Sequence, residues 1–444
     1  MIAADTIAAV ATARGRGAIG IVKLSGAQSS SIAEQITGKK LIPRRAHHLP
    51  FYGTDGEVLD RGLAILFSAP DSYTGEDVLE LHAHGNSFVL DQLLKTAIRY
   101  GARDARPGEF TERAFLNNKL DLAQAEAVAD LIESNSAQAA RAAVRSLSGD
   151  FSTGIADLNQ QLISARMYIE AALDFAEEEI DFLKDDALAT KLNQLQTSVN
   201  DILKRAAQGC LMREGLTVVI AGEPNVGKSS LLNRLTGENT AIVTDIAGTT
   251  RDVLREQIVL DGLPIHVIDT AGLRKTDDKV EQEGVRRALA QMEQADVILV
   301  VETAGSSTPT DLKRLSVPDL PMDVPVIHVF NKADLAPDSS HPEQLKVSAK
   351  TGEGIAELRI KLKQCAGFEQ TPEGAFMARR RHLNALQAAQ VHLSQARVNL
   401  VELTAGELAA EELRLAQAQL NLITGEFSSD DLLGEIFGNF CIGK

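Results

Sequence analysis

The chain has 444 residues, which is too long for one hydrophobic core and suits two or three domains of ~150 residues each. Hydrophobic residues make up 44% and charged residues 24%, which argues against wholesale disorder. The 61 acidic and 45 basic side chains give a net charge of −16. That charge argues against coating DNA or an anionic membrane through the average surface, so any contact with nucleic acid needs a local basic patch.

Targeting signals are not evident in the sequence. Asp5 stands where a signal peptide would be positively charged, and no apolar run approaches the ~18 residues of a membrane span. Three distant cysteines, Cys210, Cys365 and Cys441, form neither a CxxC pair nor a disulfide framework. These features predict a cytoplasmic protein without membrane contact.

The first 118 residues mix short β-like runs with Gly and Pro, a pattern typical of an α+β domain. The expected strands are 19–24, 63–67 and 78–82, and a helix is expected near 86–100. From about Leu120, apolar residues recur with the helical period, and this texture continues to about Ala207 with a break at 177–179.

A strand-like run at 216–221 opens a segment in which strand and helix patterns alternate to about Leu362. This alternation predicts a parallel sheet with right-handed crossovers. Helical composition returns after Gly367, which suggests one helical domain interrupted by an inserted globular domain. We therefore expect an α+β domain over 1–118, a helical domain in two parts over 119–210 and 369–444, and an inserted domain over 211–368.

The strongest motif is the segment 222–229, GEPNVGKS, which follows the predicted strand at 216–221 and precedes a predicted helix. In a P-loop, backbone N–H groups and the helix N-terminus surround the phosphates. Lys228 would reach the outer phosphates and Ser229 would bind Mg²⁺. A plain glycine turn would not also supply the strand–loop–helix context.

Further motifs complete a guanine nucleotide site. Asp269 ends a predicted buried strand, where it can hold the Mg²⁺ shell, and Gly272 can approach the γ-phosphate. In the NKAD run at 331–334, the Asp334 carboxylate can accept hydrogen bonds from guanine N1–H and N2–H₂, which adenine cannot offer. The run 347–350, VSAK, is typical of the loop that contacts guanine O6. This order predicts a Ras-like P-loop GTPase rather than an ATPase.

The loop 244–252 is the expected switch, with Thr250 completing the Mg²⁺ coordination. Leu273 follows the DTAG run where Ras-type GTPases carry the glutamine that orients water. Hydrolysis therefore needs another polar group, and the residues alone leave four candidates open. These are Arg274, Lys275, Glu281 and Glu283.

Several segments closely resemble the MnmE (TrmE) family of bacterial tRNA modification GTPases. The most specific is the terminal run 440–444, FCIGK; others are 5–9, 15–17, 72–77, 106–110, 118–122, the loop 222–229 with Asn225 inside it, and 242–252. The resemblance covers essentially the whole chain. It implies an N-terminal α+β domain that dimerises and binds 5-formyl-tetrahydrofolate or a related one-carbon folate, a discontinuous helical domain, and an inserted G domain.

The resemblance also implies an activity. With an FAD-dependent partner, MnmG, the family adds a carboxymethylaminomethyl- or aminomethyl-type group at C5 of the wobble uridine, position 34, of certain tRNAs. GTP hydrolysis accompanies G-domain dimerisation and controls the modification. The implied GTP-binding residues are Asn225, Val226, Gly227, Lys228, Ser229, Ser230, Thr244, Asp245, Ile246, Ala247, Gly248, Thr249, Thr250, Asp269, Thr270, Ala271, Gly272, Asn331, Lys332, Asp334, Ser348, Ala349 and Lys350.

The family resolves the open choice left by Leu273. It implies a K⁺ ion held by Asn225, Thr244, Ile246 and Thr249, which neutralises charge that develops on the phosphates. Glu281 takes the place of the glutamate that positions water, beside Lys228 as a catalytic group.

The implied folate-binding residues are Lys23, Glu80, Lys119 and Lys444. A close relative has arginine where this chain has Lys23, which keeps the charge and loses the bidentate fork. For Cys441 two readings stay open: a thiolate that adds to the uracil ring, or a packed C-terminal tail.

The run 379–381, three arginines, is a candidate tRNA contact, and a solvated charged face is the alternative. Two other functions fit the sequence less well than wobble-uridine modification. A regulatory GTP switch in ribosome assembly would leave the N-terminal domain and the FCIGK run unexplained, and a dimerisation scaffold would leave the P-loop unexplained.

Overall fold

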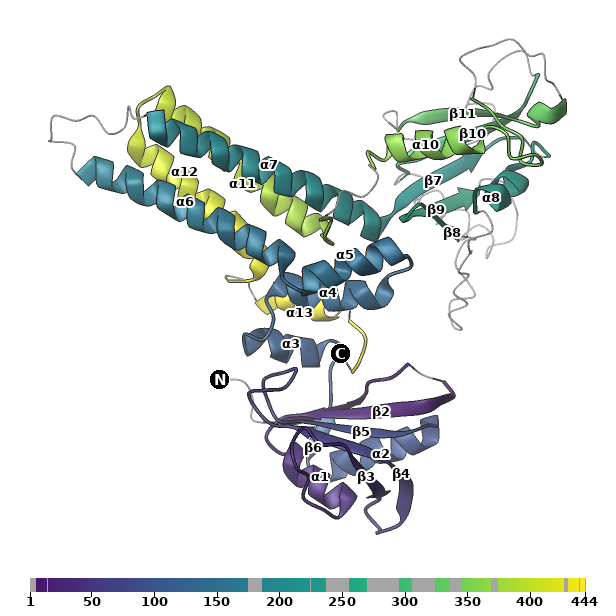
Figure 1. Cartoon of the computed structure of the whole chain (residues 1–444), viewed down its shortest axis with the longest axis vertical. Coiled ribbons are helices and arrows are strands. Elements are labelled where there is room, and N and C mark those ends of the chain that lie inside the picture. Colours follow the sequence, from purple (N-terminus) through teal and green to yellow (C-terminus); the bar gives the residue numbers. More distant parts are fainter. Residues whose placement is uncertain are drawn as a thin grey trace, which may run out of the picture. The chain divides into compact units, whose positions relative to one another are not determined.

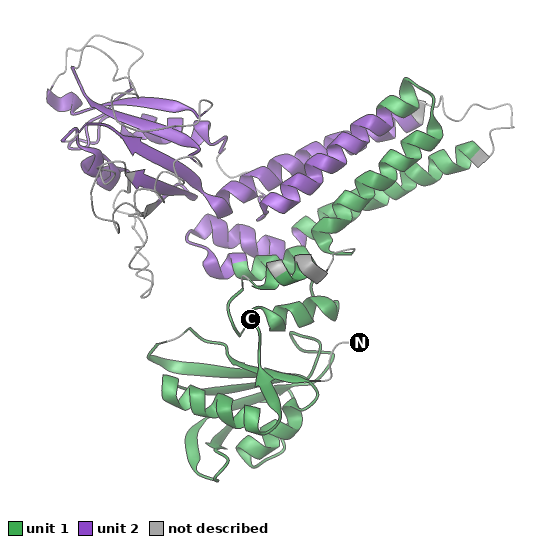
Figure 2. Ribbon diagram, turned by 180° about the vertical axis from the view of Figure 1, so that it is seen from behind, with its two compact units in different colours: residues 1–129, 151–184, 398–444 green, residues 130–150, 185–397 purple. Residues whose placement is uncertain are grey.

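A computed structural model describes residues 5–13, 15–174, 186–223, 225–236, 255–269, 295–305, 324–335, 345–368, 374–426, 430–438 and 440–443 (Figure 1). The chain divides into two compact units, coloured separately in Figure 2. Residues 1–129, 151–184 and 398–444 form the first unit, and residues 130–150 and 185–397 form the second.

The first unit contains a six-stranded sheet in the order β3-β4-β5-β2-β1-β6. Its strands are β1 Thr6–Val10, β2 Gly17–Ser25, β3 His47–Tyr52, β4 Val58–Phe67, β5 Val78–Gly85 and β6 Ala102–Asp104. The three strands expected from the sequence are confirmed within β2, β4 and β5. Only the β1–β6 pair is parallel.

Two helices, α1 Ser29–Thr37 and α2 Ser87–Arg99, pack on this sheet through Ile32, Ile36 and Leu93, which are fully buried (Figure 1). The helix α2 begins at Ser87 because the Asn86 side chain accepts a hydrogen bond from the Phe88 N–H, an N-cap. The sequence expectation of a helix near 86–100 is confirmed.

The first unit also contains α3 Glu109–Leu116, most of α4 Leu122–Glu133, α6 Asp150–Asp174, α12 Gly406–Thr424 and α13 Asp430–Gly438. The long helices α6 and α12 lie side by side (Figure 1), and the Asn159 amide donates to Asn421 at 2.7 Å. A small core joins the start of α4 to the C-terminal segment. It comprises Leu122, Ala125, Ile436, Phe437 and Phe440.

The second unit is built on a sheet in the order β12-β11-β10-β7-β9-β8. Its strands are β7 Leu216–Ala221, β8 Arg255–Leu260, β9 Leu263–Asp269, β10 Val297–Thr303, β11 Val326–Asn331 and β12 Leu345–Lys346. Five of them run parallel, as predicted. The strand β8 instead pairs antiparallel with β9, because Asp261 and Gly262 have φ of 51° and 93° and form a tight hairpin turn.

The described helices of the second unit are α5 Ala137–Leu147, α7 Asp186–Glu214, α8 Lys228–Thr236, α10 Ile355–Cys365 and most of α11 Arg380–Val401. The helices α7 and α11 lie side by side (Figure 1), where the Gln390 amide donates to Asn200 at 2.6 Å. Ala142 and Met212 join the core of the sheet, so the helical segments and the sheet share one hydrophobic core. None of the described helices is long and apolar enough to cross a lipid bilayer.

Candidate nucleotide and cofactor sites

The predicted phosphate loop lies where its chemistry requires, between the end of β7 and the start of α8. Gly227 has a φ of 94°, and a Cβ atom there would lie 2.4 Å from the Asn331 amide nitrogen. Only glycine fits both the left-handed backbone and this close approach. The next residue, Lys228, begins α8, so the loop is followed directly by a helix N-terminus, a favourable place for phosphate.

The Lys228 ammonium lies inside the loop. It is buried, and its Nζ donates to the carbonyl oxygens of Gly222 and Glu223 at 2.8 and 3.2 Å. Ser229, the predicted Mg²⁺ ligand, and Ser230 follow in the first turn of α8 and are exposed. The arrangement fits a triphosphate, because a lysine, a hydroxyl and a helix N-terminus meet at one edge of a parallel sheet.

Asn331 connects the phosphate loop to the predicted guanine loops. Its Nδ2 donates to the Val226 carbonyl at 2.9 Å, and its Oδ1 accepts from the Ala349 N–H at 3.1 Å. Lys332 adds a second connection, since its Nζ donates to the Asn225 carbonyl at 2.8 Å. Sequence reasoning placed Asn331 among nucleotide-binding residues but did not foresee that it would brace three loops.

Asp334 and Ser348 are brought together as part of the expected base site. The Ser348 hydroxyl is fully buried and donates to Asp334 Oδ1 at 2.6 Å, which orients a carboxylate that is itself exposed. Lys350 is also exposed on the same loop. An oriented, accessible carboxylate can accept two hydrogen bonds from the edge of guanine, as the motif predicts.

The metal side of the site is described only in part. Asp269 ends β9, and its side chain lies outside the described residues, as do residues 237–254 and 270–294. The predictions for Glu281 and for the switch and γ-phosphate residues therefore fall outside the described part of the chain. The latter are Thr244, Asp245, Ile246, Ala247, Gly248, Thr249, Thr250, Thr270, Ala271 and Gly272. Of the four expected K⁺ ligands, only Asn225 is described, and it is exposed with a φ of 63°.

A second candidate site lies in the first unit, where β2 pairs with β5. Lys23 faces Glu80 in register across the two strands. The Lys23 ammonium lies 4.4 Å from the ring centre of Tyr73 and 5.1 Å from that of Phe110. Burial lowers the pKa of Lys23, and the Glu80 carboxylate only partly offsets this effect. Among the described residues, no hydrogen bond or ion pair reaches this ammonium.

These groups fit a planar, anionic cofactor such as a folate. A partly buried ammonium supplies charge, the two rings supply apolar and π contacts, and Glu80 can accept hydrogen bonds from ring N–H groups. Glu80 Oε2 also lies 3.1 Å from His82 Nε2. Sequence reasoning missed Tyr73 and Phe110, although both lie in segments on which the family resemblance rests.

Contacts from α3 and the turn after it hold the Tyr73 loop. The Tyr73 hydroxyl lies 2.9 Å from Thr111 Oγ1, and Asn117 Nδ2 donates to the Thr74 carbonyl at 2.7 Å. Lys119, an expected folate ligand, is exposed, and its Nζ donates to the Pro70 carbonyl at 3.1 Å. Lys119 thus contacts the loop that contains Tyr73.

The C-terminal segment reaches the same sheet. Gly443 is buried, and a Cβ atom there would lie 2.6 Å from the Val10 carbonyl, next to the β1–β2 pair that contains Lys23. Cys441 is exposed with a free thiol, and its carbonyl accepts from the Gly108 N–H at 3.4 Å. Lys444 lies outside the described residues, and the residue before it lies against Val10 and Ala11.

A buried network of ion pairs anchors α3 to neighbouring segments of the first unit. Arg113 and Glu109 are 3% and 2% exposed and pair at 3.1 Å, and Arg113 also binds Asp5 and Glu76. Arg103 adds a second cation to Glu109. Burial alone would raise the pKa of Glu109, but hydrogen bonds from Arg103, the Arg106 backbone and Arg113 lower it to about 2.

Two of the arginines in the run 379–381 have acidic partners. Arg379 Nη2 lies 2.8 Å from the buried Asp130 carboxylate, and Arg380 Nη2 lies 2.9 Å from Glu214. An arginine already paired to a buried carboxylate is a poor phosphate ligand. The proposed tRNA contact is therefore weakened for Arg379, whereas Arg380, which is 72% exposed in its side chain, remains accessible.

The P-loop, the braced guanine loops and the parallel sheet define a multidomain α/β plus α protein of the P-loop GTPase class. Comparisons with known proteins agree. A family model described as the MnmE helical domain matches residues 122–441, and one described as the GTP-binding protein TrmE N-terminus matches residues 6–119.

Full-length relatives make the assignment specific. The chain is 56% identical to the tRNA modification GTPase MnmE of Stutzerimonas stutzeri, with 100% of this chain and 99% of the relative aligned. It is 53% identical to the proteins of the same name from Histophilus somni and Vibrio vulnificus, each aligned over 99% of both chains. The chain belongs to the MnmE family of tRNA modification GTPases.

Proposed function

We propose that this chain is a K⁺-dependent GTPase that modifies C5 of the wobble uridine in certain tRNAs, together with an FAD-dependent partner of the MnmG kind. The group added is of the carboxymethylaminomethyl or aminomethyl type, and a tetrahydrofolate supplies its one-carbon unit. The protein acts as a homodimer in the cytoplasm, with the domain boundaries expected from the sequence.

The observation that carries the proposal is the environment of Lys23. Its ammonium faces two aromatic rings and a carboxylate, on the sheet that the C-terminal segment reaches. Burying an ammonium costs free energy unless it binds a ligand. We assign folate binding to Lys23, Glu80, Lys119 and Lys444. Tyr73 and Phe110 are added to this set.

In the nucleotide site, we assign Mg²⁺ to Ser229 and Thr250, and the Mg²⁺ shell to Asp269. K⁺ is assigned to Asn225 with the switch residues, and the positioning of water to Glu281. Leu273 stands where Ras-type GTPases carry the glutamine that orients water, so hydrolysis needs other groups. Bound K⁺ would supply positive charge beside the phosphates in the transition state.

Nucleoside mass spectrometry of total tRNA tests the substrate. Deletion of the gene should remove the C5-modified wobble uridines, and a plasmid copy of this chain should restore them. A regulatory GTP switch without substrate chemistry would leave the nucleosides unchanged. Replacing Cys441 with Ser in the plasmid copy tests whether the exposed thiol takes part, since modification that persists would leave Cys441 with a packing role.

GTPase rates test the cation. Hydrolysis should be at least tenfold faster in K⁺ than in Na⁺ at equal ionic strength, since a dehydrated cation of fixed size replaces an arginine. Equal rates in the two salts would exclude Asn225 as a K⁺ ligand. Isothermal titration with 5-formyl-tetrahydrofolate tests the Lys23 site independently of both nucleotide and tRNA.

A further inference from the structure

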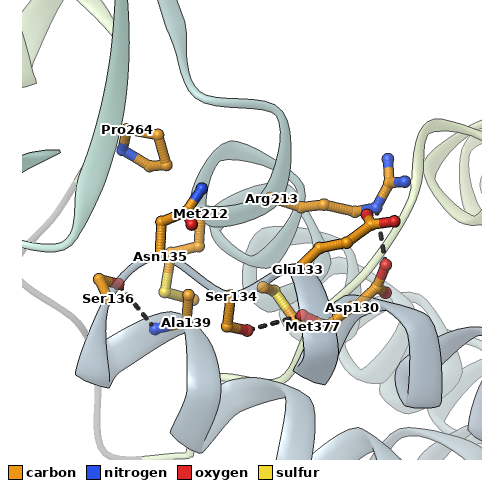
Figure 3. Close-up of a pocket in the computed structure, with 10 residues that line it drawn as sticks. All are labelled: Asp130, Glu133, Ser134, Asn135, Ser136, Ala139, Met212, Arg213, Pro264 and Met377. Carbon is orange, nitrogen blue, oxygen red and sulfur yellow. Dashed lines mark hydrogen bonds and ion pairs between the residues drawn. The ribbon is translucent and has the colours of Figure 1, made fainter. Parts of the chain in front are cut away.

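A cavity of about 210 Å³ lies within the second unit, where the helical segments meet the first residues of β9 (Figure 3). Its walls come from the end of α4, the start of α5, the end of α7 and Pro264 of β9. Asp130 and Arg213 line one side of it, and Pro264 lies across from them (Figure 3).

The Asp130 carboxylate is 4% exposed and holds two guanidinium groups through one oxygen atom. Arg213 Nε and Arg379 Nη2 each lie 2.8 Å from Asp130 Oδ1. Asp130 is itself fixed at the end of α4, where the Ser134 hydroxyl donates to its backbone carbonyl at 2.6 Å. A carboxylate oxygen bound in this way by two guanidinium groups holds both of them in one geometry.

The two arginines occupy special positions along the chain. Arg213 is in the last turn of α7, just before the chain enters the nucleotide-binding sheet at Leu216. Arg379 directly precedes α11, after the chain has left that sheet and passed through α10. One carboxylate therefore ties the entry of the sheet segment and its exit to the end of α4.

The strand β9 links this joint to the nucleotide site. His266 Nε2 lies 3.0 Å from the carbonyl of Glu214, the last residue of α7, and Pro264 lines the cavity. The far end of the same strand is Asp269, the predicted metal-site residue. A shift of β9 along its axis would therefore reach both the phosphates and the joint, and the cavity leaves room for it.

We propose that Asp130 is a positioning residue that couples the nucleotide state of the sheet to the helical segments. This inference rests on the proposed function, since it requires that GTP hydrolysis controls tRNA modification. Asp130 touches neither nucleotide nor tRNA in this role. It keeps both ends of the sheet segment aligned with α4, so that a movement of β9 is transmitted to the helical segments.

The main test replaces Asp130 with Asn in the full-length chain. The amide keeps the shape of the carboxylate but removes the charge that holds the two guanidinium groups. Affinity for a fluorescent GDP analogue and basal GTP hydrolysis should stay within twofold of wild type, because the Asp130 carboxylate is bound by Arg213 and Arg379 and not by a described residue of the nucleotide loops. Wobble-uridine modification, measured by nucleoside mass spectrometry in the complemented deletion strain, should fall at least tenfold.

The matched control is Glu411→Gln, which breaks an exposed ion pair with Arg414 on α12. It should match wild type in all three measurements. A second variant, Asn135→Trp, fills the cavity without removing any member of the ion pairs. It should likewise reduce modification while hydrolysis stays near the wild-type rate. Its control is Asn193→Trp, an exposed site on α7.

Modification at the wild-type level in both Asp130→Asn and Asn135→Trp would overturn the proposal. So would a parallel loss of nucleotide affinity, hydrolysis and modification in both variants, since that result denotes unfolding alone. If only Asp130→Asn fails to fold, Asn135→Trp decides. Unmodified tRNA in the strain that carries wild-type protein would instead refute the proposed function.

Discussion

Asn331 donates its side-chain amide to the Val226 carbonyl at 2.9 Å, so the loop expected to bind guanine also fixes the loop expected to bind phosphate. The same side chain accepts from the Ala349 N–H, which brings in the third loop. The base and phosphate parts of the site are therefore one hydrogen-bonded structure, and substitution at Asn331 should affect both.

Replacing Asn331 with Ala should weaken binding of both GTP and GDP about tenfold or more. Asn331 is 2% exposed, so the change leaves a buried carbonyl and a partly buried N–H without their partner, at a cost of roughly 1–3 kcal/mol. Fluorescent-nucleotide titration measures the effect. Leu335→Ala, at a site 73% exposed on the same loop, is the control and should bind normally. Wild-type affinity in Asn331→Ala would show that the brace is dispensable.

Asp334→Asn should change base specificity rather than abolish nucleotide binding. The amide N–H₂ would face guanine N1–H and N2–H₂, donor against donor, which should reduce GTP affinity roughly 10²–10⁴-fold. Xanthine carries an acceptor oxygen at C2 in place of the amino group, so xanthosine triphosphate should bind the variant better than GTP does. Competition titration of the two nucleotides decides, and an unchanged preference for GTP would remove Asp334 from the base site.

Lys23 should make folate binding sensitive to alkaline pH. Because burial lowers the pKa of Lys23, its ammonium loses its proton at a lower pH than an ordinary lysine. Affinity for 5-formyl-tetrahydrofolate should therefore fall as pH rises, before the usual lysine range is reached. The Lys23→Arg variant keeps its charge throughout and should bind with little pH dependence over that range. Titration calorimetry across pH would contradict this if both proteins gave the same curve.

Glu109 should stabilise the N-terminal sheet domain in a pH-dependent way. Its folded pKa of about 2 lies below its ordinary value of 4.5, so its contribution is complete above 4.5 and is lost as pH falls toward 2. Glu109→Gln leaves Arg103 and Arg113 without their carboxylate and should cost roughly 3–5 kcal/mol at neutral pH.

The matched control for this variant is Glu112→Gln, which removes the carboxylate paired with the exposed Arg106 and should cost under about 1 kcal/mol. Thermal unfolding followed from pH 2 to 7 measures both variants. The loss in Glu109→Gln relative to wild type should shrink as the pH is lowered. A constant difference across that range would mean that packing, not charge, accounts for the effect.

Local sequence patterns predicted much of the secondary structure around the candidate nucleotide site. The strand at 216–221, the following P-loop and the helix beginning at Lys228 are neighbours in sequence, so their order alone specifies the arrangement. The antiparallel β8 was not foreseen, although the Asp-Gly pair at 261–262 signals its hairpin turn.

Contacts between residues that are distant in the sequence could not be predicted from the sequence alone. The Asn331 brace joins residues about a hundred positions apart, and the Lys23 site combines β2 with Tyr73 and Phe110 from separate segments. Arg379 looked like a solvated charge or a tRNA contact, because nothing local reveals that Asp130 lies beside it. Such pairings depend on the tertiary fold, and a single sequence contains no periodic signal for them.

Since Arg213 and Arg379 are held by the same oxygen atom of Asp130, their guanidinium groups lie within two hydrogen-bond lengths of each other. The stretch of chain between them thus leaves and rejoins its host at almost one point. Because the two ends of this inserted segment are close together, the segment could be deleted and replaced by a short linker without separating the host helices. The same geometry explains how a complete nucleotide-hydrolysing module can occupy the middle of a helical domain without splitting it.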